Sequence, residues 1–328
     1  MFIKKDLRKI TTILADAAVN DNDYDASSPS KLLLDLRLQK RKAEFKGSVK
    51  ILCQPSNRQA LSQLQSLSLY DCEIQSLQGI GMLTTLQTLN VGRNPLTTVP
   101  DDLSNLRSLQ SLWLDDCSFE GEFPAPILKL TALRELRLSN NRLTNVPCNI
   151  NILSRLAVLG LDNNRLTEVP NEIQRLQELT TLLLRSNLLT ELPNWRLPNL
   201  QVLHCSSNQL TALPDTLVHC RALTHLYANS NRLTAIPTGL DLVKSLQRIN
   251  LSHNLIDHVP TAFLETFGRP DANGVCVHDQ QHEEEQQQEP NQCTVWMRDN
   301  PVLTQFAAEK KEDNPMDVST PTETLLTV

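Results

Sequence analysis

The chain contains very few glycines and aromatic residues, and several catalytic signatures are missing from it. Only nine of its 328 residues are glycine, and no phosphate-binding glycine loop is present, which excludes a P-loop GTPase module. Kinase signatures and a nucleophile elbow are also absent. Aromatic residues make up 4% of the sequence, so leucine rather than aromatic packing must fill the interior. No apolar stretch approaches the roughly 20 residues of a membrane-spanning helix.

Net positive charge is lacking as well. The formal charge is −6 and the pI is about 5.7, which argues against a general nucleic-acid binder. The charge is uneven: residues 1–60 carry twelve Lys/Arg and seven Asp/Glu, so that segment has a net charge of +5 and the remainder −11. The basic segment could contact an acidic partner or a membrane surface, although a solvated helix face is the simpler interpretation.

The eight cysteines do not form a clustered framework that would indicate structural disulfides. Cys205 and Cys220 occupy positions that a buried apolar residue would fill, and the others are scattered. We therefore expect free thiols in a reducing compartment and a cytoplasmic protein. The alternative is a mitochondrion or another organelle, because residues 1–19 form an amphipathic helical pattern with a basic start. Asp6 and Asp16 count against a transit peptide, so a cap or a docking helix is preferred.

A nine-fold repeat dominates the middle of the chain, with the pattern L-x-x-L-x-L-x-x-N-x-L-x-x-L-P and steps of 21 to 24 residues. The leading leucines are Leu64, Leu86, Leu109, Leu133, Leu156, Leu179, Leu200, Leu223 and Leu246. One clear copy reads Leu156, Leu159, Leu161, Asn164, Leu166, Val169 and Pro170. A fixed period of this length predicts a solenoid, because one repeat cannot bury its apolar face alone.

The pattern resembles the intracellular leucine-rich-repeat family, and the closing proline resembles the Ras-group subtype, which includes Scribble-like, Ras-suppressor-like and plant Ras-group proteins. These prolines are Pro100, Pro147, Pro170, Pro193, Pro214, Pro237 and Pro260. Two repeats depart from it: the first lacks the proline, and the third, with Phe119 to Pro124, resembles a longer plant-type repeat. The resemblance implies an α/β horseshoe-shaped solenoid with about ten parallel strands on its concave face and short helices or 3₁₀ turns on its convex face.

Within each repeat, a period of two places alternate residues inward on a short strand, and a polar residue follows the strand. Amides at this position can satisfy backbone groups where the chain turns inward, so we expect a ladder along the stack, with two cysteines replacing asparagine. The predicted ladder residues are Cys72, Asn94, Cys117, Asn141, Asn164, Asn187, Asn208, Asn231, Asn254 and Asn300.

The repeats define the expected domain organisation. It comprises an amphipathic helix and linker at 1–29, an N-terminal cap at 30–63, nine repeats at 64–267, a disordered acidic and Gln-rich insertion at 268–293, a truncated last repeat with a C-terminal cap at 294–311, and a disordered tail at 312–328. Ser28 and Pro29 should start a cap helix that runs to about Phe45. Val49 to Leu52 should be an edge strand.

The strand phase also predicts which residues face outward on the concave face. The first outward column is Ser68, Asn90, Trp113, Arg137, Gly160, Leu183, His204, Tyr227, Asn250 and Trp296. The second is Tyr70, Gly92, Asp115, Ser139, Asp162, Arg185, Ser206, Asn229, Ser252 and Arg298. From these we select Trp113, Asp115, Arg137, Asp162, Leu183, Arg185, His204, Tyr227, Trp296 and Arg298 as the partner-binding residues. Trp, Tyr and Arg are common interface anchors, and Trp113 beside Arg137 predicts a cation–π contact.

The functional expectation is a non-catalytic scaffold or adaptor that binds a folded protein and needs no cofactor. The resemblance implies a small GTPase, a phosphatase or a kinase as the partner. The acidic and aromatic residues of the face favour a basic protein surface. Two weaker alternatives are capture of the C-terminus, ending in Val328, by a PDZ domain, and a metal site or enzyme built on Cys276, His278, His282 and Cys293. The spacing of those four residues favours a polar loop without metal.

Overall fold

The structure, a computed structural model, describes residues 35–37, 47–54, 57, 61–271, 273–276, 293–304 and 306. The strands are β1 (Asp35–Arg37), β2 (Ser66–Ser68), β3 (Thr88–Asn90), β4 (Ser111–Trp113), β5 (Glu120–Gly121), β6 (Glu135–Arg137), β7 (Arg142–Leu143), β8 (Val158–Gly160), β9 (Thr181–Leu183), β10 (Val202–His204), β11 (His225–Tyr227), β12 (Arg248–Asn250), β13 (Val275–Cys276) and β14 (Thr294–Trp296). The helical segments are the 3₁₀ turns η1 (Val49–Ile51), η3 (Ile80–Met82), η4 (Asp101–Asn105), η5 (Ala125–Lys129), η6 (Cys148–Ile152), η7 (Asn171–Arg175), η8 (Asp215–His219) and η9 (Leu240–Leu242), and the helix α3 (Thr261–Phe267).

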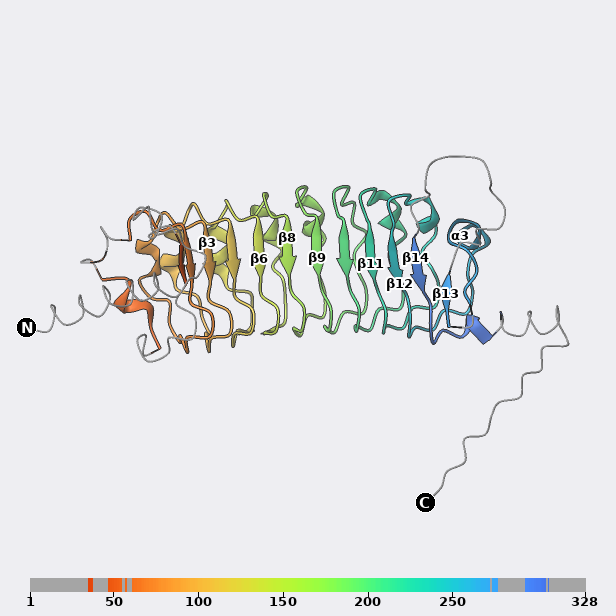
Figure 1. The fold of residues 1–328 in the computed structure, drawn as a ribbon, viewed down its shortest axis with the longest axis horizontal. Coiled ribbons are helices and arrows are strands. Elements are labelled where there is room, and N and C mark those ends of the chain that lie inside the picture. Colours follow the sequence, from red (N-terminus) through yellow and green to blue (C-terminus); the bar gives the residue numbers. More distant parts are fainter. Residues whose placement is uncertain are drawn as a thin grey trace, which may run out of the picture.

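One long sheet organises the described part of the chain. Its strand order is β1-β2-β3-β4-β6-β8-β9-β10-β11-β12-β14-β13, so nearly every strand pairs with its neighbour in sequence. All of these pairs are parallel except β13 with β14. The strands lie side by side along the long axis of the molecule (Figure 1). Each turn of the chain adds one strand and one convex segment, which confirms the predicted solenoid.

Leucine packing produces the core, as the repeat predicted. In the fifth repeat, Leu159 within β8 and Leu161 directly after it are fully buried, and the following Asp162 is partly exposed. The repeat prolines set the convex side: Pro147 and Pro170 have extended backbone angles and directly precede η6 and η7. A proline there fixes φ and lacks an N–H that a helix start would leave unpaired.

The shortest repeat shows how the core adapts to a missing turn. Its step from Leu179 to Leu200 is 21 residues, and no helical turn forms between Pro193 and Leu200. Trp195, only 1% exposed, lies in this segment and is the largest fully buried side chain. We infer that its indole supplies the volume that a 3₁₀ turn provides in the other repeats.

The asparagine ladder forms as expected. The Oδ1 of Asn164 accepts a hydrogen bond from the Leu143 N–H at 3.0 Å, and its Nδ2 donates to the carbonyls of Leu138 at 2.9 Å and Leu161 at 3.1 Å. Equivalent side-chain bonds are made by Asn94, Asn141, Asn187, Asn208, Asn231, Asn254 and Asn300. Each amide therefore joins two successive turns and satisfies backbone groups that the sheet leaves unpaired.

Cys72 and Cys117 occupy ladder positions, but a thiol cannot make all of the hydrogen bonds that an asparagine amide makes there. The Cys117 thiol lies 3.6 Å from the Val91 carbonyl, in the place of an asparagine Nδ2. It offers no amide oxygen to the preceding turn, and the Leu96 N–H instead donates to the Asn94 carbonyl only two residues earlier, at 2.7 Å. Cys72 is buried, and its N–H donates to the Asn94 Oδ1 at 3.0 Å.

A left-handed residue precedes every ladder position. These residues, with φ between 52° and 58°, are Asp71, Arg93, Asp116, Asn140, Asn163, Ser186, Ser207, Ser230, His253 and Asp299. None of them is glycine, although this conformation costs most residues roughly 1 kcal/mol. The hydrogen bonds of the ladder residue offset this strain, because the left-handed turn brings the side-chain amide that follows it to the backbone groups of the adjacent turn.

Three expectations at the ends of the solenoid were wrong. A strand, β1, stands where the cap helix was predicted to run through residues 35–37, and Asp35 to Arg37 pair with Ser66 to Ser68. The open edge of β2 accepts a parallel strand, so backbone pairing overrides the local helical pattern. The remainder of the predicted 1–29 helix and linker and of the 29–45 helix lies outside the described residues.

The predicted edge strand at Val49 to Leu52 is instead the 3₁₀ turn η1. Ser48 precedes this turn, and its side chain accepts a hydrogen bond from the Lys50 N–H at 3.3 Å. Val49 and Leu52, three residues apart, are both buried against the first repeat. A turn buries this pair on one side, whereas a strand would place them on opposite faces.

The insertion expected to be disordered from residue 268 begins with ordered structure. Asp271 accepts hydrogen bonds from the Asn273 and Val275 N–H groups at 2.8 and 2.9 Å, and this turn leads into β13. Cys276 in β13 is 1% exposed, so the strand covers the last parallel strand, β14 (Figure 1). Residues 277–292 and 307–328 lie outside the described part, including the expected tail.

Candidate binding face

The concave face carries three columns of strand side chains and, at its rim, the column of left-handed residues described above. Residues of the first predicted column pair in register along the sheet, and the second column follows two positions later in the sequence. Sequence reasoning missed a third column, one residue before the first inward leucine of each strand. It consists of Ser66, Thr88, Ser111, Glu135, Val158, Thr181, Val202, His225, Arg248 and Thr294. Extending the same period of two by one step would have found it.

Trp113 and Arg137 form a coupled pair on β4 and β6. The Arg137 guanidinium carbon lies 5.5 Å from the Trp113 ring centroid, which confirms the predicted cation–π contact. The Arg137 Nε also contacts the Glu135 Oε1 at 2.6 Å. Glu135 therefore fixes the guanidinium over the indole and neutralises its charge. The Trp113 Nε1 is buried without a hydrogen-bond partner among the described residues.

Asp115 and Asp162 have a structural role that the sequence did not indicate. The Asp115 Oδ1 accepts a hydrogen bond from the Ser139 N–H, and the Asp162 Oδ1 accepts one from the Arg185 N–H, both at 2.7 Å. Burial raises the pKa of both carboxyls, although these hydrogen bonds act in the opposite direction. The negative charge of Asp115 further raises the pKa of Asp162.

An aromatic and aliphatic cluster occupies β9 to β11. The His204 and Tyr227 rings meet edge to face with centroids 5.2 Å apart, and the His225 ring lies 6.0 Å from Tyr227. Leu183 pairs in register with His204 and is partly exposed. Burial, followed by the positive charge of Arg185, lowers the pKa of His204, so its imidazole is neutral at neutral pH.

Gly160 creates a gap in the first column between Arg137 and Leu183. An added Cβ would meet the Ser139 Oγ at 3.4 Å and the Arg137 Cγ at 3.5 Å, which are contacts with movable side chains. A Cβ is therefore compatible with the backbone here. The gap separates the Trp113 and Arg137 pair from the His204 and Tyr227 cluster.

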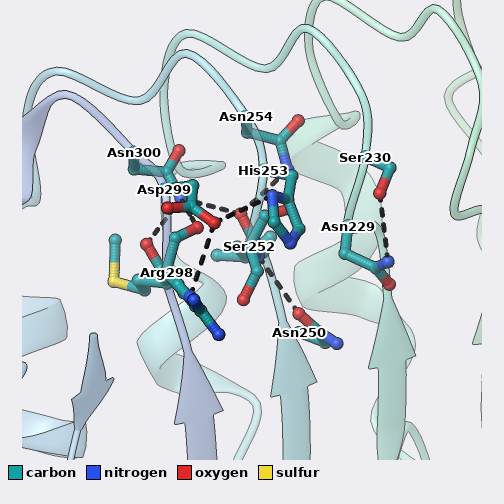
Figure 2. Close-up of polar contacts among 11 residues, drawn as sticks. Asn229, Ser230, Asn250, Ser252, His253, Asn254, Arg298, Asp299 and Asn300 are labelled. Carbon is teal, nitrogen blue, oxygen red and sulfur yellow. Dashed lines mark hydrogen bonds and ion pairs between the residues drawn. The ribbon is translucent and has the colours of Figure 1, made fainter. Parts of the chain in front are cut away.

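Near the C-terminal end, polar residues connect the last two turns at the rim. The His253 Nδ1 lies 3.0 Å from the Asp299 Oδ2, and the Arg298 Nε lies 3.5 Å from the same oxygen (Figure 2). Arg298 is 73% exposed and Trp296 is partly exposed. The predicted residues therefore extend along the face, with Asp162 and Arg185 connecting the Trp113 and Arg137 pair to the His204 and Tyr227 cluster, and with Trp296 and Arg298 at the C-terminal end.

The cysteines offer little reactive chemistry. All eight are free thiols, and burial raises the pKa of Cys53, Cys117, Cys205, Cys276 and Cys293 to about 12. Such thiols are poor nucleophiles. The described residues contain no group of three or more His, Cys, Asp or Glu side chains that could hold a metal ion. His278 and His282 of the possible metal set lie outside these residues.

A stack of parallel strands with polar ladders and an open, partly aromatic face defines a class: solenoid proteins that display a surface. The chain carries leucine-rich repeats. Residues 85–106, 108–130 and 132–153 match the family described as Leucine Rich Repeat, and residues 177–218 match Leucine Rich repeats (2 copies). Proteins of this kind are generally non-catalytic binding modules.

Solved structures share the fold. A leucine-rich-repeat protein of Leptospira interrogans is 29% identical, with a TM-score of 0.65 over 74% of this chain and 67% of that chain. The ectodomain of the Arabidopsis thaliana receptor kinase GASSHO1/SCHENGEN3, in complex with Casparian strip integrity factor 2, is 33% identical with a TM-score of 0.52, over 60% of this chain and 25% of that one. The plant peptide hormone receptor RGFR1, in complex with RGF2, is 25% identical with a TM-score of 0.54, over 68% and 40%.

A curated protein of Lymnaea stagnalis, the putative neurotrophin receptor LTRK 1, is 32% identical over 76 residues, which are 23% of this chain and 10% of that protein. The chain therefore spans a small part of this relative and of the plant receptor. Within the part of the chain that the structure describes, no helix is long and apolar enough to cross a membrane.

Proposed function

We propose that the chain is a protein-interaction scaffold that binds a folded partner on the concave face. The observation that carries this proposal is the placement of large side chains there: Trp113 beneath Arg137, the His204 and Tyr227 pair, and the partly exposed Leu183 and Trp296. Buried aromatic and arginine anchors dominate binding energy at protein interfaces. The asparagine ladder holds the repeats beneath these side chains in place, so binding costs little conformational entropy.

The similarity to solved receptors supports a binding role in general terms, since two of them are in complex with Casparian strip integrity factor 2 and with RGF2. For the cell compartment we propose the cytoplasm, supported by eight free thiols rather than disulfides. The Ras-group proline pattern supports a partner in small-GTPase, phosphatase or kinase signalling. These assignments rest on sequence resemblance and thiol chemistry.

The test is affinity capture from a lysate of the source organism with the intact chain and two matched variants. Gly160→Trp places an indole in the gap at the centre of the concave face. Leu242→Trp places the same side chain on η9, where the native leucine is 61% exposed. A partner held by the intact chain and by Leu242→Trp, and lost by Gly160→Trp, supports the proposal.

Circular dichroism and thermal unfolding of both variants serve as the folding control. A partner retained by a folded Gly160→Trp variant would move the binding site to the convex side or the insertion. Loss of the partner by both variants would indicate that neither position reports on the concave face.

A further inference from the structure

Charge is segregated along the concave face. Strands β4, β6 and β8 and their rim residues carry four acidic side chains, here called the acidic pole: Asp115, Asp116, Glu135 and Asp162. Strands β9 to β14 and their rim residues carry three arginines, Arg185, Arg248 and Arg298, and three histidines, His204, His225 and His253, here together called the basic pole. The neutral imidazole of His204 adds no charge at neutral pH. Strands β2 and β3 with their rim residues add one residue of each sign, Asp71 and Arg93.

The opposite charges within each pole are already paired. In the acidic pole, the guanidinium of Arg137 contacts Glu135 at 2.6 Å and the Trp113 ring. In the basic pole, Asp299 contacts His253 at 3.0 Å and Arg298 at 3.5 Å. These pairs reduce the outward effect of the minority charges, so the residual field of each pole keeps its majority sign.

The majority charges are available to a partner. Arg185 and Arg248 are exposed and form no ion pair with a described residue. Asp115 and Asp162 each use their Oδ1 to accept a backbone N–H, and the Ser139 side chain also hydrogen-bonds to the Asp115 carboxylate. Burial disfavours the charged forms of both carboxyls and raises their pKa, and the charge of Asp115 acts in the same direction on Asp162. Arg137 beside Asp115 and Arg185 beside Asp162 oppose this effect, and a further cation supplied by a partner would add to their action.

Where the two poles meet, at β8 to β10, apolar residues lie beside the charged ones. Gly160 leaves the gap described above, and the partly exposed Val158, Leu183 and Val202 surround it on β8 to β10. Parallel strands lie about 4.8 Å apart, so the centre of the acidic pole at β6 and that of the basic pole at β11 are about 19 Å apart. About six residues of extended chain cover this distance.

We propose that the concave face recognises a charge-polarised segment of a partner protein, with basic side chains over β4 to β8, acidic side chains over β9 to β14 and an apolar side chain in the gap at Gly160. This inference rests on the proposed function and specifies the chemistry of the partner. It refines the expectation of a basic partner surface, because Arg185, Arg248 and Arg298 would repel basic groups over β9 to β14.

The probe is a fluorescein-labelled 14-residue peptide with four lysines, a six-residue Gly/Ser linker centred on one leucine, and four glutamates. The control peptide has the same composition with lysine and glutamate alternating. Fluorescence anisotropy with the full-length chain should give a Kd about tenfold lower for the block peptide, and the difference should shrink as ionic strength rises from about 0.05 to 0.5 M.

Two double variants test the poles separately. Asp115→Asn with Asp162→Asn keeps an oxygen acceptor for each backbone N–H, and Arg185→Gln with Arg248→Gln removes exposed charge only. Each should weaken block-peptide binding about three- to tenfold. The control, Arg175→Gln with Arg221→Gln, removes two exposed arginines outside the concave face and should change the Kd less than about twofold.

Equal affinity for the two peptides, or no binding of the block peptide, overturns the inference. An equal effect of the control variant also overturns it, since net charge alone would then explain binding. The proposed function is judged separately by whether Gly160→Trp loses the captured partner. A partner lost by that variant, combined with no preference for the block peptide, would leave the concave-face scaffold standing and reject charge polarity.

Discussion

Replacing Asn187 with alanine measures what one step of the amide ladder contributes to stability. The Asn187 Oδ1 accepts from the Leu166 N–H at 3.1 Å, and its Nδ2 donates to the Leu161 and Leu184 carbonyls, both at 3.0 Å. These two carbonyls also accept from neighbouring ladder amides, from Asn164 at 3.1 Å and from Asn208 at 2.9 Å. After substitution, therefore, only the Leu166 N–H loses its sole partner.

The expected magnitude follows from this sharing. An unsatisfied buried N–H destabilises by about 1–3 kcal/mol, and each lost hydrogen bond to a carbonyl that keeps a second donor adds about 0.5 kcal/mol. We expect Asn187→Ala to lower the free energy of unfolding by about 2–4 kcal/mol. Urea denaturation followed by circular dichroism measures this value if both proteins unfold in a single transition.

The matched control is Asn171→Ala, at an exposed residue of η7 with no side-chain hydrogen bond to the described residues. It should change the unfolding free energy by less than about 0.5 kcal/mol. A loss below about 0.5 kcal/mol for Asn187→Ala would refute the view that the ladder holds successive turns together.

Four further outcomes are expected. Cys117→Asn should raise the unfolding free energy by about 1 kcal/mol in urea denaturation, because an amide oxygen would again accept the N–H of the preceding turn; a loss would show that the slot is too small for an amide. The pKa of His204 is lowered from 6.5, so the folded state binds fewer protons and the unfolding free energy should fall as the pH drops through about 6.5. Unfolding curves at about pH 5.5 and 7.5 should show that His204→Gln removes this part of the pH dependence. The pKa of Asp115 is raised above 3.8, so the folded state binds more protons and this carboxyl should reduce stability as pH rises; the stability gained by Asp115→Asn should be larger at about pH 7 than at about pH 4. Mass spectrometry after brief iodoacetamide treatment should find Cys148, which is exposed, alkylated before the fully buried Cys205, and the opposite order would contradict the burial described here.

Much of the fold was predictable because every repeat has the same pattern of buried leucines and the same asparagine position. A period of two fixes which side of the strand Leu159 and Leu161 occupy, and the following Asn164 must pair where the sheet ends. Stacking then requires only that neighbouring copies match. Contacts between adjacent copies, such as Trp113 with Arg137, could be predicted for the same reason.

The ends were not predictable in this way, because no neighbouring copy fixes their conformation. Residues 35–37 have a helical pattern, but the unpaired edge of β2 selects a strand. Val275 and Cys276 lie in a polar insertion, yet the free edge of β14 pairs with them. In both places a tertiary hydrogen-bonding edge outweighs local propensity.

Within the binding face, position was predictable but role was not. The sequence placed Asp115 and Asp162 on the surface, but only the structure shows that their carboxylates accept backbone N–H groups of the next turn. The buried Trp195 was similarly undefined by the pattern, because its repeat is shorter than its neighbours. The structure adds most to the sequence-based prediction where one repeat differs from its neighbours.

The most direct measurement is the affinity of the captured partner for the intact chain, for Gly160→Trp and for Leu242→Trp, by isothermal titration calorimetry. An indole at the centre of the concave face should raise the Kd at least about 100-fold, the scale of a blocked hot spot, whereas the same side chain on η9 should change it less than about twofold. Unchanged affinity for a folded Gly160→Trp variant would contradict the assignment of the concave face as the binding surface.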